Sequence, residues 1–400
     1  MRRMEELDLT SRALRGRDLV VFSNDWDGDP LSKTHIMRIL ARENRILWVN
    51  SIGNRAPKVN THDARRIWNK LSTFTRGVRE VEPNLYVLAP LAVPFYGSPA
   101  ITRVNGQLLR LQVKRAMKAL GFTRPISWSF LPASAPVSGT LGEELVVYQC
   151  VDEFSAFSDT NGRHIANLED QLLKKANLVI TSAERLYQSK SKVNSSTVLV
   201  RHGVDFQHFV KACDPQTRIP EDLARLPKPV IGFFGLFADW VDQAAIAACA
   251  RAYPQGSVVI LGKVAPDTSV EKLKALPNVH FLGRRPYDAL PAYCKGFDVA
   301  LMPFTVNELT LNSNPLKVRE YLAAGLPVVS SDIPEVRKVG LCKLAKSSAD
   351  YPAKVQECLD EGAGPNRERA ERIFKESWDA RVDEIRGHVG QVLLKLGRSF

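Results

Sequence analysis

The sequence predicts an α/β protein of two successive Rossmann-like domains, each with a parallel sheet covered by helices. Three observations predict this fold class. At 400 residues the chain is too long for one ordinary hydrophobic core. Apolar runs of strand length alternate with stretches of helical periodicity. This alternation stops over a proline-rich segment near the middle of the chain and then starts again.

The first half of the chain has seven apolar runs with the length of buried strands. A helix is predicted over Leu31–Glu43, where Ile36, Ile39 and Leu40 share one side. These elements predict a first domain over residues 1–205. The seven predicted strands are Leu19–Ser23, Arg45–Asn50, Leu85–Ala89, Ile126–Phe130, Leu145–Cys150, Leu178–Thr181 and Thr197–Val200.

Residues 206–228 combine prolines with charges and show little periodicity, so we predict a linker there. A second domain is predicted over residues 229–375, with helices at 240–253, 286–296 and 315–324. The stretch 366–397 is predicted to be helical, and residues 376–400 are assigned to a terminal helix that packs on the first domain. The predicted strands of the second domain are Pro229–Phe234, Ser257–Leu261, Val279–Leu282, Val299–Pro303 and Pro327–Ser331.

Composition narrows the class of protein. With 44% hydrophobic and 24% charged residues, the chain is expected to be globular. No apolar run approaches the roughly 20 residues that span a bilayer, and the charged start of the chain does not resemble a signal peptide. The six cysteines form no CxxC pair, so we expect reduced thiols, a cytoplasmic protein and no metal site.

One segment of the second domain has the features of an anion site. Pro315 is suited to the first position of a helix, whose free amides and dipole would face an anion. Lys317 adds a positive charge in the first turn, and Glu320 and Tyr321 follow on the same face. The amides and the ammonium suit a diphosphate, and the carboxylate suits a ribose diol. An ordinary helix with a solvated Lys317–Glu320 pair is the alternative.

The string from Asn314 to Pro327, NPLKVREYLAAGLP, resembles the donor-binding helix of GT-B glycosyltransferases. It is most similar to family-4-like (group 1) bacterial enzymes that build surface polysaccharides. The resemblance implies two Rossmann-like domains with a cleft between them and a C-terminal helix that crosses back to the first domain. It also implies that the second domain holds a nucleoside-diphosphate sugar, with Lys317 on the phosphates and Glu320 on the ribose. We expect no metal cofactor, because the helix dipole and cations can stabilise the leaving diphosphate.

Other segments extend the resemblance along the chain. They are residues 177–182, 201–205, 278–283 and 297–304. Two departures concern the donor site: the loop after the first strand of the second domain, from Gly235, lacks phosphate-binding Arg and Lys, and Asn312 replaces the first Glu of the Glu-x7-Glu pattern of retaining enzymes. The complete predicted donor set is Lys317, Glu320, Asn314, Ser313, Asn312, Tyr321, Arg284, Arg285, Gly235 and His202.

An inverting transfer needs a base that takes a proton from the acceptor hydroxyl. Asp152 follows a predicted buried strand, in a segment that resembles the "YxxxD" element of xanthan-type membrane-associated glucuronosyltransferases. The resemblance implies that Asp152 is the catalytic base, with Glu153 as a substitute. Asp25, in the first loop with Trp26, is a further candidate for holding the acceptor. Helix capping or turn formation would explain the same acidic residues.

The net charge of +12 is unevenly distributed, because residues 51–130 contain thirteen Lys and Arg but only three acidic residues. Between Ile101 and Leu120, cations are interleaved with apolar residues at helical spacing, just after the apolar stretch Leu91–Tyr96. We expect peripheral contact with the inner face of the plasma membrane through this basic segment, near a sugar or lipid-linked acceptor. A solvated helix face is the alternative. Nucleic acid is disfavoured because no binding module is recognisable.

These features together predict a metal-independent glycosyltransferase that moves a sugar from a nucleoside-diphosphate sugar to a hydroxyl of a polysaccharide or lipid-linked acceptor. A nucleotide-sugar 2-epimerase and a non-catalytic nucleotide-sugar-binding subunit are the alternatives. A dinucleotide-dependent dehydrogenase is disfavoured, because the first strand is not followed by GxGxxG.

Overall fold

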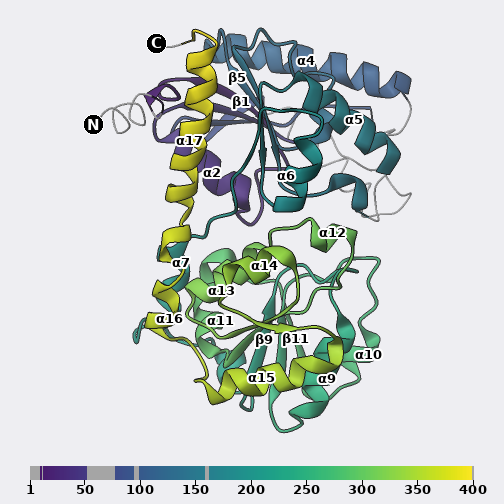
Figure 1. Ribbon diagram of the computed structural model, residues 1–400, viewed down its shortest axis with the longest axis vertical. Helices are drawn as coiled ribbons and strands as arrows, with labels where there is room; N and C mark the ends of the chain where they lie inside the picture. The colour runs from purple at the N-terminus through teal and green to yellow at the C-terminus, as the bar shows by residue number, and fades with distance from the viewer. Residues whose placement is uncertain (1–9, 11, 52–76, 94–98, 158–161, 399–400) are drawn as a thin grey trace. The chain divides into compact units, whose positions relative to one another are not determined.

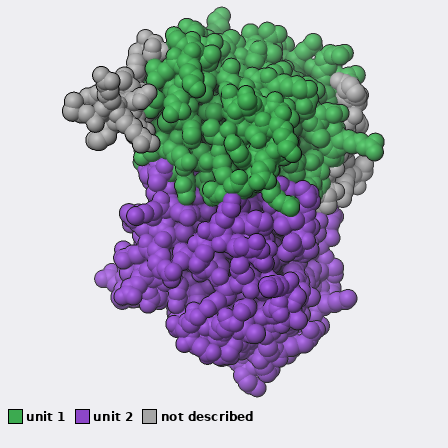
Figure 2. Space-filling view, in the orientation of Figure 1, with its two compact units in different colours: residues 1–201, 381–400 green, residues 202–380 purple. Residues whose placement is uncertain are grey.

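The computed structural model describes residue 10 and residues 12–51, 77–93, 99–157 and 162–398. It confirms the predicted fold class. The chain divides into two compact units, coloured separately in Figure 2. The first unit contains residues 1–201 and 381–400, and the second contains residues 202–380.

The described part of the first unit contains an eight-stranded sheet (Figure 1) with strand order β3-β4-β2-β1-β5-β6-β7-β8. Its strands are parallel except for β3, which pairs with β4 in the antiparallel direction. The seven predicted strands are present within one or two residues. The bounds are β1 Asp18–Phe22, β2 Arg45–Val49, β3 Val78–Glu82, β4 Leu85–Leu88, β5 Ile126–Ser129, β6 Leu145–Cys150, β7 Leu178–Thr181 and β8 Thr197–Leu199.

The central strands of this sheet are buried on both faces, as the continuous apolar runs predict. One core cluster joins β1 and β2 to α4 through Leu109, Val113 and Met117. Another joins β6 and β7 to α5 through Leu168 and Leu172. The described helices are α2 Ser32–Ala41, α4 Pro99–Leu120, α5 Gly162–Lys175 and α6 Glu184–Lys190, with short 3-10 turns η1 Pro132–Ser134 and η2 Phe154–Ala156.

The second unit, all of whose residues are described, has a six-stranded parallel sheet with strand order β11-β10-β9-β12-β13-β14. The five predicted strands are present. A sixth strand, β14, was not predicted because it has only three residues and is half-exposed. The bounds are β9 Val230–Phe234, β10 Ser257–Leu261, β11 Val279–Gly283, β12 Val299–Met302, β13 Val328–Ser331 and β14 Lys343–Ala345.

Helices cover both faces of this sheet and enclose two core clusters. The predicted helices at 240–253, 286–296 and 315–324 correspond to α9, to η4 with α11, and to α13. Their bounds are α9 Gln243–Ala252, α10 Glu271–Lys274, η4 Tyr287–Ala289, α11 Leu290–Gly296, α12 Glu308–Leu311, α13 Leu316–Ala323, α14 Pro334–Val339, η5 Ser348–Asp350 and α15 Tyr351–Asp360.

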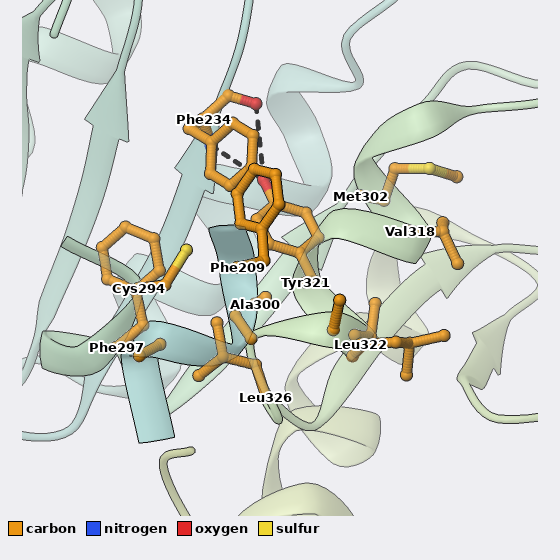
Figure 3. Packing of buried hydrophobic residues seen from close by; sticks show 14 of the residues in the cluster. Phe209, Phe234, Cys294, Phe297, Ala300, Met302, Val318, Tyr321, Leu322 and Leu326 are labelled. Atoms are coloured by element: carbon orange, nitrogen blue, oxygen red, sulfur yellow. Dashed lines mark hydrogen bonds between the residues drawn. The ribbon is translucent and has the colours of Figure 1, made fainter. Parts of the chain in front are cut away.

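The segment 206–228, predicted to be a linker, packs into the second unit instead of forming an extended connection. It contains α7 Phe206–Phe209, η3 Val210–Cys213 and α8 Glu221–Ala224. Phe206, Phe209 and Leu223 are buried in the same core cluster as α13, part of which is drawn in Figure 3. These contacts could not be predicted from the sequence. Each helix is only about one turn long, so its buried residues show no helical periodicity among the prolines and charges.

The predicted helical stretch 366–397 is interrupted. The structure has α16 Arg367–Glu371, the turn η6 Phe374–Glu376 and then α17 Trp378–Lys395. At the break, Val204 pairs with Ser377, so the chain enters the second unit beside the residues through which it leaves. Residues 381–400, which include most of α17, cluster with the first unit. In the described part of the chain, no helix is long and apolar enough to cross a bilayer.

Candidate functional site

The carboxyl edge of the second sheet is lined by glycine backbone. Gly235 and Gly262 follow β9 and β10, Gly283 ends β11, and all three have positive φ angles. The Gly235 N–H donates to Leu261 O at 2.8 Å. A Cβ on Gly262 would overlap the Gly235 carbonyl. The strand ends are therefore close together and free of side chains, as close approach of a ligand requires.

Lys317 lies over this glycine edge. It is in the first turn of α13, which begins at the carboxyl edge because it connects β12 to β13. A Cβ on Gly235 would overlap Lys317 Cε and would lie 2.8 Å from Nζ. The ammonium makes no hydrogen bond or ion pair with the described residues, and burial lowers its pKa although the charge of Glu320 raises it. A half-buried cation without a direct partner suits an anionic ligand.

Glu320 lies one turn further along the same face of α13. Burial raises its pKa to about 7, against the opposing effect of Lys317, and the nearby Asp205 carboxylate raises it further. Asp205 caps α7 by accepting from His208 N at 3.1 Å. The Lys317 ammonium, the Glu320 and Asp205 carboxylates and the glycine edge thus lie close together in the second unit. The cation and the backbone suit a diphosphate, and a carboxylate suits the hydroxyls of a ribose.

Tyr321, which we predicted in the donor set, contacts the glycine edge from inside the hydrophobic core. It is fully buried, and its hydroxyl accepts from Phe234 N at 2.8 Å (Figure 3). Phe234 is the last residue of β9, so Tyr321 fixes the start of the Gly235 loop. Its proposed contact with the donor stays a prediction.

Arg319 is a structural residue that the sequence reasoning missed. It is 2% exposed, and it donates to Asn314 Oδ1 at 2.5 Å and to Glu376 Oε2 at 2.6 Å. The Asn314 carbonyl is also 2.8 Å from His202 Nδ1. Asn314 and His202 therefore hold the residues before α13 in place. No sequence signal marked Arg319, because Glu376 is 57 residues away.

The remaining predicted donor residues have protein partners. Asn312 donates to the Glu308 carboxylate at 2.7 Å, and Ser313 Oγ donates to Thr310 O at 2.8 Å. Arg285 donates to Asp222 at 2.7 Å and lies over the ring of Tyr293. Arg284 is exposed directly after Gly283. Donor contacts by these four residues stay predictions, and for Arg285 the ion pair with Asp222 would compete with them.

In the first unit, Asp152 follows β6 at the carboxyl edge of its sheet. Burial raises the pKa of its carboxyl to about 6, although the charge of Lys33 lowers it. Glu153 instead pairs with Lys190 at 2.9 Å. Despite burial, which raises it, the pKa of Glu153 lies below its ordinary value, because Lys190 and Ser155 stabilise the ionised form. Asp152 is the better placed of the two to accept a proton near neutral pH.

The loop after β1 presents Asp25 to solvent and turns Trp26 inward. Trp26 contacts the edge of Trp48 at 5.0 Å between ring centroids, and the Arg38 guanidinium lies 5.2 Å from its ring. Trp26 is thus packed against protein. The role of Asp25 toward the acceptor stays a prediction. Across the described residues, no three His, Cys, Asp or Glu side chains gather as metal ligands would, and metal independence also stays a prediction.

Comparison with known proteins gives a family match within the second unit. A family model described as "Glycosyl transferases group 1" matches residues 228–361. The second unit contains a group 1 glycosyltransferase domain. The match covers the glycine edge, α13 and every predicted donor residue except His202. The group 1 domain therefore holds the Lys317–Glu320 site.

One curated relative is the putative teichuronic acid biosynthesis glycosyltransferase TuaH of Bacillus subtilis, which is 25% identical over 226 residues. That alignment spans about half of each protein, 53% of this chain and 56% of the relative. The likeness therefore reaches beyond the group 1 domain without covering the whole chain.

Solved structures with the same fold cover nearly all of the chain. Sucrose-phosphate synthase from Thermosynechococcus elongatus matches 95% of this chain and 99% of its own, with a TM-score of 0.67 and 15% identity. Anabaena HepE in complex with UDP-glucose matches 95% and 98%, with a TM-score of 0.59 and 14% identity. Both α/β domains thus share the GT-B fold of glycosyltransferases, as the resemblance implies.

Proposed function

We propose that this protein transfers a sugar from a nucleoside-diphosphate sugar to a hydroxyl of a polysaccharide or lipid-linked acceptor. The observation that carries the proposal is Lys317, an ammonium without a direct partner among the described residues, which lies over the glycine edge at the start of α13. The helix start and the ammonium would hold the diphosphate and stabilise it as it leaves. Glu320 would accept from the ribose hydroxyls.

Uridine is the nucleoside named for several of the solved structures with this fold, although a starch synthase was solved with ADP. HepE was solved with UDP-glucose and with UDP, and TuaH is named as a putative glycosyltransferase of teichuronic acid biosynthesis. A UDP-sugar and a cell-surface polysaccharide are therefore the donor and product that we would test first.

On the acceptor side, Asp152 is proposed as the base of an inverting transfer. It would take the proton from the acceptor hydroxyl while the oxygen attacks the anomeric carbon and the bond to the diphosphate breaks. A pKa near 6 leaves the carboxylate ionised at pH 7 and still able to accept a proton. Glu153 is already paired with Lys190, which makes it the weaker candidate.

Contact with a membrane surface is a further part of the proposal, and α4 supports it. Val104, Leu108 and Leu111 are exposed on this helix. The exposed cations of α4 share the same side, and the helix has no acidic residue. Apolar and basic side chains on one face suit an anionic lipid surface. Residues 52–76 of the basic segment and part of Leu91–Tyr96 lie outside the described residues.

Donor binding tests the central claim. UDP and UDP-sugars should bind the wild-type protein in a calorimeter, and Lys317→Ala should weaken binding by about 30-fold or more, since a charge-assisted contact contributes about 2 kcal/mol. Lys274→Ala, an exposed lysine on α10, is the matched control. Equal affinity of both variants would contradict the proposal.

Catalysis is tested separately. Asp152→Asn should keep the donor affinity and lose transfer by about 100-fold or more. Epimerised sugar formed from the donor alone would favour the epimerase instead. Donor binding with no transfer or hydrolysis in any assay would favour a non-catalytic subunit.

A further inference from the structure

Lys33 occupies an unfavourable position for a cation. It is the second residue of α2, where the helix dipole disfavours positive charge. The residue is also only 6% exposed. Burial lowers the pKa of the ammonium to about 8, against the opposing effect of Asp152. A lysine in this position costs stability unless a nearby group offsets the cost.

The loop after β1 holds Lys33 in a fixed place. Lys33 Nζ donates to Asn24 Oδ1. The Asn24 carbonyl accepts from the indole N–H of Trp48 at 2.9 Å, and Trp48 is fully buried in β2. The Trp26 N–H, two residues further on, donates to Asn50 Oδ1 at 3.1 Å. The ammonium is therefore oriented by a loop that β2 anchors.

Asp152 lies on the same carboxyl edge, since β5 alone separates β1 from β6 in the sheet. Its carboxylate makes no hydrogen bond or ion pair with the described residues, and Lys33 is the charged group that acts on it. The other acidic side chains near β6, Glu153 and Glu169, both bind Lys190 instead. Lys33 and Asp152 thus form an electrostatically coupled pair without a hydrogen bond or ion pair between them.

We infer that Lys33 is a positioning residue for the base of the first unit: it keeps the Asp152 carboxylate ionised and available to the acceptor hydroxyl. This inference rests on the proposed function, in which Asp152 accepts the proton. Lys33 acts through its charge, and Asn24 fixes the direction from which that charge acts. A direct salt bridge would occupy the carboxylate oxygens that the reaction needs, so a separated pair suits a base better.

The pH dependence of kcat/KM tests the inference. In the wild-type enzyme the acidic limb should have its midpoint near pH 6, because activity needs ionised Asp152. Lys33→Met should move this midpoint upward by about one pH unit or more, since the ionised form loses its nearby cation. Activity at pH 5.5 should fall about 10-fold while KM for the donor is unchanged. Lys33→Arg, which keeps the charge, should retain a midpoint close to that of the wild type.

Lys174→Met, which removes an exposed lysine of α5, is the control and should leave the profile unchanged. An unmoved midpoint in Lys33→Met would overturn the inference. A raised KM for the acceptor without a shift of the limb would overturn it too, because Lys33 would then bind substrate directly.

A second measurement does not depend on activity. The carboxyl pKa of Asp152, taken from the difference between NMR titrations of the wild type and Asp152→Asn, should rise in Lys33→Met. If this pKa rises but Asp152→Asn keeps full activity, the electrostatic coupling between Lys33 and Asp152 is supported. The proposal that Asp152 is the catalytic base is then refuted. No rise in this pKa would refute the coupling, whatever the role of Asp152.

Discussion

At the scale of single residues, the second unit depends on Gly235, because Lys317 occupies the space that a Cβ would need. Gly235→Ala should displace the lysine or the loop, and the φ of +138° adds strain for any L side chain. We expect UDP affinity to fall about 10-fold or more in calorimetry and the melting temperature to drop.

Gly340→Ala is the matched control for this prediction. Gly340 also has a positive φ, of +69°, but nothing lies within 4 Å of the place that a Cβ would take there. This variant should lose about 1 kcal/mol of stability from backbone strain and keep the donor affinity. If both variants bind UDP as the wild type does, the close packing of Lys317 on Gly235 is irrelevant to the donor.

The sequence predicted part of this site because its residues are close along one helix. Lys317 and Glu320 lie one turn apart, and helical periodicity places them on one face. Tyr321 has the same spacing, yet the structure buries it under Phe234. The pairing of Arg319 with Glu376 and the approach of Asp205 to Glu320 link distant segments. Spacing within a helix carries no information about such contacts.

At the scale of elements, the buried strands were predictable, whereas two of the four edge strands, β3 and β14, were not predicted. β1, β2 and β6 are buried almost throughout, so their sequences are continuous apolar runs. β3 reads Val-Arg-Glu-Val-Glu and is half-exposed at the sheet edge. An edge strand needs only one protected face, and charges there oppose unwanted pairing. This explains why an antiparallel strand was absent from the predicted parallel sheet.

The helix α4 was predicted from the periodicity of residues 101–120, and its exposed face leads to an element-scale prediction. The wild-type protein should sediment with vesicles that contain phosphatidylglycerol and much less with phosphatidylcholine vesicles. Replacing Arg103, Lys114 and Lys118 by Glu should weaken this binding about 100-fold or more, since each basic residue near an anionic surface contributes about 1 kcal/mol.

A control for general charge is available in the second unit, where Lys272, Lys274 and Lys375 are exposed. Their replacement by Glu makes the same change in net charge and should leave most vesicle binding intact. Equal loss in the two triple variants would mean that net charge, and not the α4 face, governs the interaction. Donor affinity should be unchanged in both.

At the scale of the whole molecule, the order of the two domains followed from the restart of the strand pattern after the proline-rich segment. The packing of that segment did not follow, because its short helices contribute only a few buried side chains each, such as Phe209 and Leu223. Within the second unit, residues near its two ends are also paired, through Val204 and Ser377. Such pairing depends on residues 173 positions apart, which periodicity does not connect.

The proposed reaction makes a prediction about the whole enzyme, namely that it needs no divalent metal. The charge that develops on the leaving diphosphate would be met by Lys317 and by the amides at the start of α13. Transfer measured in excess EDTA should therefore stay within about twofold of the untreated rate, whereas Lys317→Ala should be slow with or without EDTA. A rate that falls at least 10-fold in EDTA and returns with Mg²⁺ or Mn²⁺ would show that these protein groups are insufficient. A divalent metal ion would then have to supply the missing positive charge at the donor site.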